Sequence, residues 1–278
     1  MAKARGTFDT RKFLTITGLF AAVAALMLFT KPDDPAKNRT VNPQGTIPHT
    51  ILLLKSKNAE GSISVNGVPI AAHKAGREPH HSRLSLTPWL QNGDNTLTIT
   101  ATHPTPQASP KIEAKLERHQ PGQAPIVKPL LTVTKPGSIS RKITAQNLPL
   151  WQWQQGEEGL HSRQDIAKAI KTLHKAYQDK DIKLIRQIER PLFQEMVQLT
   201  GREGLERRVY RGEIIEKGRA APLPAFTIIP YHNGKLIRVT GKDGEAPIRI
   251  YYAYGGGGKV ILTGKYWSKI NGSWQVVR

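Results

Sequence analysis

Hydrophobic and polar positions follow two different periods along this chain, a period of two in its first half and a helical period later. Within residues 50–136, Ile63 and Val65 share one side of a strand that ends at Asn66-Gly67, a strong turn dipeptide. Similar short runs are HTILLLKS, NTLTITAT, KIEAKLERH and LLTVTK. We therefore predict an all-β sandwich domain over residues 50–136.

The apolar spacing becomes that of amphipathic helices after Ser162, a residue suited to an N-cap. One face of the first predicted helix carries Ile166, Ile170, Leu173 and Tyr177. The second helix lies in DIKLIRQIERPLFQEMVQLTG, where we expect Pro191 to kink or restart it. A third, short helical piece is predicted over EGLERRVYR.

Only strand patterns follow Pro224, and turn-forming residues separate them. The runs are AFTIIPYH, KLIRVTG, APIRIYYAY, KVILTGKYWSKI and SWQVVR. The last separator, Asn271-Gly272, predicts a two-residue hairpin that brings Trp267 across from Trp274 and Val276. Residues 161–278 are thus predicted to form an α+β domain, joined to the sandwich by a linker over residues 137–160.

Two segments of the predicted sandwich resemble a known kind of module. Val65-Asn66-Gly67, followed later by WLQNGDNTL at residues 89–97, resembles the jelly-roll modules of the galactose-binding-like kind found in sugar-active enzymes. The resemblance covers about fifty residues and consists of turn chemistry. It implies the scaffold and does not carry sugar binding, because ligand loops vary within such modules.

The order of elements in residues 161–278, two or three helices and then four or five antiparallel strands, resembles the NTF2-like cone fold. YQDKDIKLIRQI, as the step between two helices, and the closing NGSWQVV contribute to this resemblance. It implies a curved sheet that wraps a long helix and opens a pocket. Cone-fold enzymes place an Asp-His or Asp-Tyr pair in that pocket, where burial raises the pKa of the carboxylate.

The N-terminal segment from Phe13 to Thr30 contains 18 residues without a charge. That length nearly spans a membrane, and the apolar run continues past Ala22–Ala24, the best signal-peptidase site, so we favour an uncleaved transmembrane anchor over a signal peptide. The basic residues before it predict a cytoplasmic tail over residues 1–12, an anchor over 13–30 and a polar stalk over 31–49. The bulk of the chain would then be periplasmic, on a bacterial inner membrane.

The composition favours some kinds of binding partner and excludes some kinds of chemistry. Its 41 lysines and arginines against 21 aspartates and glutamates give a net charge of +20, which favours anionic partners such as nucleic acid, acidic lipid headgroups or an acidic protein face, and a glycan contact is a further possibility. Nucleic acid is unlikely as a partner, because basic residues are spread along the chain rather than gathered in one stripe. The chain has no cysteine, which excludes disulfides, thiolate metal sites and a thiol nucleophile.

Candidate catalytic residues do not form a recognisable set. The residues considered are His174 with Asp165 or Asp179, and neither pairing has a recognisable spacing. His174 lies nine positions after Asp165, too far along one straight helix for contact, and it fits the edge of the apolar stripe better. His80-His81 fits a solvated loop better than a metal site. Phosphate-loop and nucleophile-elbow motifs are absent from the sequence. We therefore predict no catalytic residue, no metal and no cofactor.

Aromatic residues are the remaining binding candidates. These are Trp151, Trp153, Tyr251, Tyr252, Tyr254 and Trp267. In an extended chain Trp151 and Trp153 face one side, where they either pin the two domains together or, if exposed, offer a stacking platform for sugar. Tyr252 and Tyr254 are expected on one side of their strand and Tyr251 on the other.

These observations favour a non-catalytic interaction or scaffold subunit of a bacterial envelope assembly, with envelope proteins as partners. The layout is similar to that of type IV secretion assembly factors, in which a single-pass anchor bears a cone-fold domain, although those lack a sandwich between the two. One alternative is a small-molecule lyase, isomerase or hydrolase that uses the cone pocket. The other is glycan or peptidoglycan binding through the sandwich.

Overall fold

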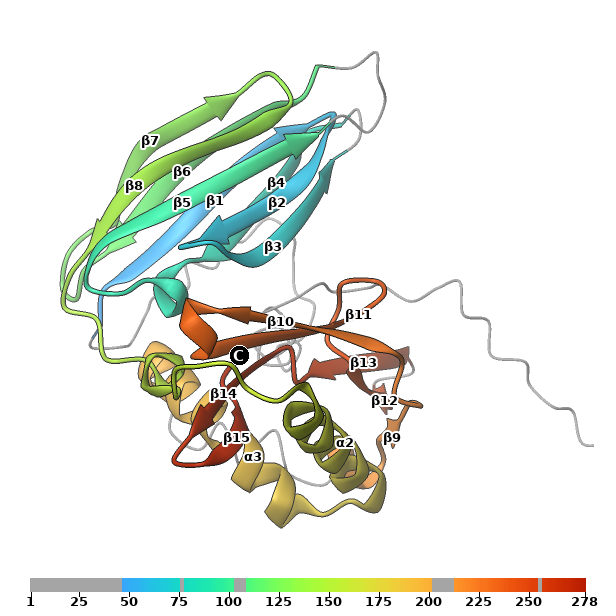
Figure 1. Cartoon of the computed structure of the whole chain (residues 1–278). Coiled ribbons are helices and arrows are strands. Elements are labelled where there is room, and N and C mark those ends of the chain that lie inside the picture. The colour runs from blue at the N-terminus through green and yellow to red at the C-terminus, as the bar shows by residue number, and fades with distance from the viewer. Residues whose placement is uncertain (1–46, 76–77, 103–108, 202–212, 255–256) are drawn as a thin grey trace, which may run out of the picture.

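The structure, a computed structural model, describes residues 47–278 except 76–77, 103–108, 202–212 and 255–256. It consists of a β-rich region followed along the chain by an α+β region (Figure 1). The predicted anchor at residues 13–30 and the predicted helical piece EGLERRVYR lie outside the described residues. None of the helices in the described part has the length and apolarity needed to cross a membrane.

The β-rich region is built from two four-stranded antiparallel sheets, in the orders β4-β1-β6-β7 and β3-β2-β5-β8. The strands are β1 (His49–Lys57), β2 (Ala59–Val65), β3 (Val68–Ala75), β4 (His80–Ser85), β5 (Gly93–Thr102), β6 (Lys111–His119), β7 (Ile126–Val133) and β8 (Gly137–Ala145). The sheets pack face to face because alternate residues of each point inward, as Leu52 and Leu54 of β1 and Ile63 and Val65 of β2 do.

Two of these strands were not predicted. His80 and His81 belong to β4, an edge strand paired with β1, rather than to a loop, and both side chains are exposed. The predicted linker over residues 137–160 contains β8, which pairs with β5 along its whole length. Its first six residues have mostly exposed side chains, so the hydrophobic pattern carries little strand signal there.

The WLQNGDN segment stabilises local turns of the β-rich region. Asn66 and Gly67 have φ of 50° and 80° and form the predicted turn between β2 and β3. The buried side chain of Asn95 accepts from the backbone N–H of Gln91 and donates to the carbonyls of Gln91 and Gly93. Its Oδ1 also accepts from Nδ2 of Asn66. These polar groups are satisfied within the fold.

Two long helices open the α+β region, α2 (Arg163–Asp179) and α3 (Ile182–Thr200). Ser162 caps α2 as predicted, since its side chain accepts from the N–H groups of Gln164 and Asp165. Asp181 caps α3 in the same way through Leu184. The second helix continues through Pro191 as a single element and does not restart there.

Two antiparallel sheets follow the helices, in the orders β10-β11-β14-β15 and β13-β12-β9. Their strands are β9 (Arg219–Ala220), β10 (Phe226–Tyr231), β11 (Leu236–Gly241), β12 (Ile248–Tyr254), β13 (Gly257–Thr263), β14 (Tyr266–Ile270) and β15 (Ser273–Val276), preceded by the short α5 (Glu213–Glu216). The run KVILTGKYWSKI forms two strands, because Gly264 at φ 75° breaks it. In the predicted final hairpin, Trp267 pairs with Val276 and Trp274 with Lys269.

Helices and strands of the α+β region share one core. Ile166, Ile170 and Leu173 of α2 pack in a cluster with buried residues of α3, β11, β12, β14 and β15. All three α2 side chains are at most 1% exposed, so the apolar stripe read from the sequence is the face that packs on the sheet.

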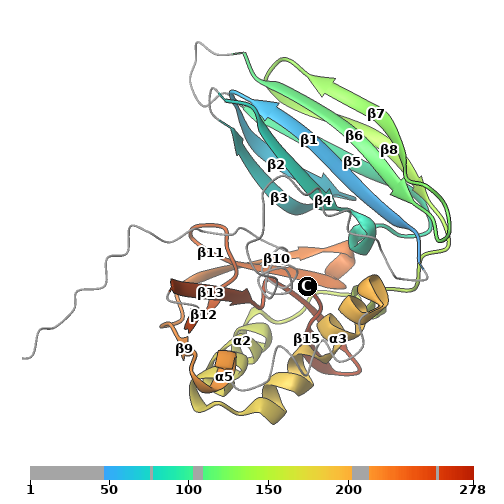
Figure 2. The ribbon, with the colours of Figure 1, turned by 180° about the vertical axis from the view of Figure 1, so that it is seen from behind.

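The two regions are joined by a continuous apolar core. The cluster that fills the β-rich region also contains Leu236, Tyr266, Ile270 and Val277 of the α+β region. Figures 1 and 2 show the C-terminal end of the described chain at this junction, between the two halves.

Candidate functional site

Trp151 and Trp153 lie at the junction of the two regions and are buried, with 0% and 3% of their surface exposed. The short 3₁₀ helix η3 (Gln152–Gln155) follows Trp151, so this segment is not extended. Trp151 Nε1 donates to the Leu90 carbonyl at 2.7 Å, and Trp153 Nε1 donates to that of Pro88 at 3.2 Å. Neither ring has the exposed face that a sugar-stacking platform requires.

A buried ion pair lies beside these rings. Glu195 of α3 contacts the guanidinium of Arg278, and both side chains are almost fully enclosed. Burial raises the pKa of Glu195, and the attraction of Arg278 opposes that shift. Arg278 also donates to the Pro88 carbonyl at 2.6 Å and lies about 5.4 Å from the centre of the Trp151 ring. These contacts therefore link the β-rich region to the α+β region.

The other predicted aromatic residues do not gather into one site. Trp267 is fully buried in the core of the α+β region, where its Nε1 donates to the Gly264 carbonyl. On β12, Tyr252 is buried and Tyr251 is 40% exposed, in line with the predicted alternation. The side chain of Tyr254 lies outside the described residues.

A second buried carboxylate of α3, Glu189, lies in the interior of the α+β region. It accepts hydrogen bonds from the Tyr177 hydroxyl at 2.9 Å and from the Thr263 hydroxyl, and all three side chains are buried. Burial and the nearby Glu189 raise the pKa of Tyr177 well above its ordinary value. This set resembles an acid-base group in composition, but at most 8% of each residue's surface is exposed.

His174 and Asp179, which were considered as an acid-base pair, each contact another group of the fold. His174 Nε2 lies 2.7 Å from the carbonyl of Ala221, and Asp179 forms an ion pair with Lys175. Across the residues that the structure describes, no group of three or more histidines, aspartates and glutamates is arranged to hold a metal ion.

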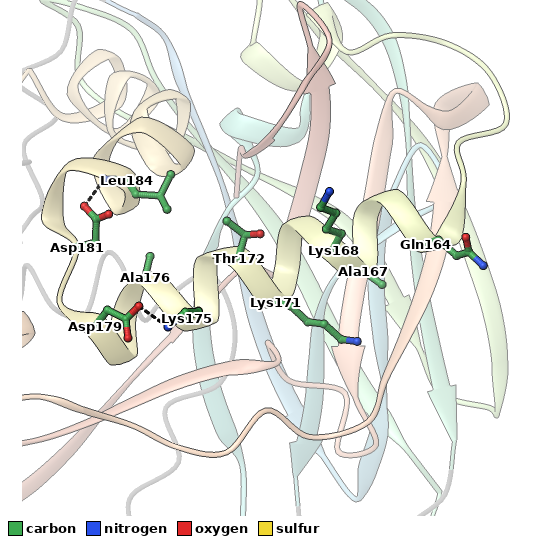
Figure 3. A pocket seen from close by; sticks show the side chains of 10 residues that line it. All are labelled: Gln164, Ala167, Lys168, Lys171, Thr172, Lys175, Ala176, Asp179, Asp181 and Leu184. Atoms are coloured by element: carbon green, nitrogen blue, oxygen red, sulfur yellow. Dashed lines mark hydrogen bonds and ion pairs between the residues drawn. The ribbon is translucent and has the colours of Figure 1, made fainter.

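Hollows occur on the outside of α2 instead. A groove of about 550 Å³ runs along its solvent face to the start of α3. Three lysines line it, Lys168, Lys171 and Lys175, with Ala167 and Leu184 as apolar lining (Figure 3). Lys175 pairs with Asp179 at 2.7 Å. Among the described side chains, Lys168 and Lys171 have no ion-pair partner. Asp179 and Asp181 also line the groove, at its α3 end, so its positive charge lies at Lys168 and Lys171.

A second groove of about 410 Å³ lies between the N-terminal part of α2 and β10. Its helix wall is made by Arg163, Gln164 and Ala167, and its strand wall by Phe226, Thr227 and Ile228. Because Gln164 and Ala167 line both grooves, the two hollows adjoin. The combined surface has basic side chains above half-buried apolar ones, which suits an anionic ligand with some apolar character.

These grooves were not predicted, although the spacing of the lysines that line the first groove can be seen in the sequence. Lys168, Lys171 and Lys175 recur at helical spacing on the face opposite Ile166 and Ile170. That pattern marks a basic helix face. The strand that borders this face lies about sixty positions further along the chain, and no local pattern in the sequence predicts that the two pack together.

Comparison with protein-family models, with curated proteins and with solved structures found no match to this chain.

Proposed function

We propose that this protein is a membrane-anchored periplasmic subunit of a bacterial envelope assembly and acts by binding partner proteins rather than by catalysis. In this proposal residues 13–30 are the anchor, the β-rich region is a jelly-roll-like sandwich and the α+β region is an NTF2-like cone. The helix-then-strand order and the closing hairpin support the cone assignment.

The location of polar groups and hollows is the observation that carries the proposal. Glu189, inside the α+β region, is buried and accepts hydrogen bonds from two hydroxyls, and Glu195 is buried in an ion pair with Arg278, so neither offers a surface to a substrate. The two grooves lie outside α2 and carry basic side chains. Such a distribution supports recognition at the surface over chemistry in a pocket.

The two alternatives receive less support. A cone enzyme needs an accessible acid or base, whereas His174 and Glu189 are buried and hydrogen-bonded. Glycan stacking on Trp151 and Trp153 needs exposed rings, and both are buried.

An affinity pull-down of the full-length chain, extracted from membranes in mild neutral detergent, tests the proposal. We expect envelope proteins to co-purify in stoichiometric amounts, as identified by mass spectrometry. A chain that purifies alone, as a monomer or homodimer, would contradict it. Deletion of residues 161–278 is a poor control because it would expose the apolar core shared by both regions.

A further inference from the structure

The outer edge of β10 is open within the described part of the chain. This strand is the first in the order β10-β11-β14-β15, and its only strand partner there is β11. An open edge presents unpaired N–H and C=O groups, to which an extended peptide can add as a further strand. The groove between β10 and α2 is lined by Phe226, Thr227 and Ile228 of this strand, and β11 contributes none of its described lining residues.

Pro230 indicates which backbone groups face the open side. Proline has no N–H, so in an edge strand its nitrogen lies on the side away from the neighbouring strand. Backbone direction alternates along a strand, so the N–H groups of Phe226 and Ile228 point to the same open side. Only these two N–H donors precede Pro230 on that side, which suits a short added segment better than a whole sheet of a second copy.

Basic side chains near this edge indicate that the added peptide is acidic. Arg163 stands in the groove itself, and Lys168 and Lys171 stand in the adjoining one. None of the three forms an ion pair with another described residue, and Asp179 and Asp181 of the adjoining groove lie at its end away from Gln164, so the three positive charges are available to a ligand. The apolar strand wall of Phe226 and Ile228 lies in a hollow that a flat membrane surface would not fill.

We propose that the groove between β10 and α2 binds an extended acidic segment of a partner protein, which adds a strand to the edge of β10 and places its carboxylates beside Arg163, Lys168 and Lys171. This inference rests on the proposed function, because it names the partner chemistry and the docking site of the same interaction module.

The direct test uses the full chain in neutral detergent and a short labelled peptide in which glutamate alternates with valine. The comparison peptide alternates lysine with valine. The test variant is Arg163→Glu with Lys171→Glu. Its matched control, Lys142→Glu with Arg190→Glu, changes the net charge equally at exposed positions of β8 and α3.

We expect the acidic peptide alone to bind, measured by fluorescence anisotropy, and to slow amide hydrogen exchange at Phe226 and Ile228. The test variant should bind it about tenfold more weakly, since two attractive pairs become repulsive, while the control keeps most of its affinity. Equal binding of both peptides, or equal loss in both variants, would overturn the proposal. So would slowed exchange caused by added phosphatidylglycerol and not by the peptide.

The pull-down separates failure of this site from failure of the proposed function. Partners lost from the test variant and kept by the control support the site. Partners kept by both variants contradict the site and leave the proposed function standing. Partners absent from the unaltered chain contradict the proposed function itself, whatever the peptide does.

Discussion

The stability of this fold is coupled to pH through three histidines, the buried His73 and the half-buried His49 and His232. Burial lowers the pKa of each, and nearby basic groups, His119, His80 and Lys235 respectively, lower it further. For His73, Glu60 acts in the opposite direction. Neither ring nitrogen of His73 has a hydrogen-bond partner among the residues that the structure describes. Each of these rings therefore favours its neutral form in the folded protein.

We predict that the free energy of unfolding falls as the pH drops below about 6.5. The unfolded chain takes up protons on these histidines at a higher pH than the folded chain does, so protonation favours unfolding. Above that pH all three are neutral in both states and contribute no slope. Urea denaturation between pH 7 and pH 5 measures the effect.

His73→Gln should reduce this pH dependence, whereas His81→Gln, at an exposed position of β4, should leave it unchanged. A pH profile that is the same for both variants would show that burial of His73 does not contribute.

The elements of this fold follow from local chemistry wherever their signals are local. The cap at Ser162, the apolar stripe of α2 and the Asn271-Gly272 hairpin were each predictable, because every contact involved lies within a few residues or across one turn. The strands β4 and β8 were not, because exposed polar residues dominate them and only their neighbours β1 and β5 make them strands.

At the scale of an element, we expect Ser162→Ala to destabilise the protein by about 1 kcal/mol, because the N–H groups of Gln164 and Asp165 lose their acceptor. Thr172→Ala, at an exposed position inside the same helix, is the control and should not destabilise, since alanine favours helix there. Thermal unfolding followed by circular dichroism compares the two. Equal melting temperatures for the two variants would contradict the capping role.

At the scale of the whole molecule, the two regions are held together by contacts between residues distant in sequence. Glu195 and Arg278 meet beside Trp151, and one apolar cluster runs through both regions. The two regions therefore share packing energy, and a change at their junction is felt in both.

For the whole molecule we predict that Trp151→Ala lowers the free energy of unfolding by about 3–5 kcal/mol, the range found for removal of a large buried aromatic side chain. Leu160→Ala is the matched control in the same connecting segment, and it should have little effect because Leu160 is fully exposed. Calorimetry of the full chain measures both. Similar unfolding temperatures for the two variants would show that Trp151 does not hold the regions together.

The sequence by itself determined the turns, the helix caps, the two hydrophobic periods and hence the change from a β-rich to an α+β region, because each depends on neighbours a few positions away. The tertiary structure decided which aromatic rings are buried, which carboxylate meets Arg278 and which strand borders the lysines of α2. Those outcomes require segments tens of residues apart to pack together, and no local pattern specifies their pairing.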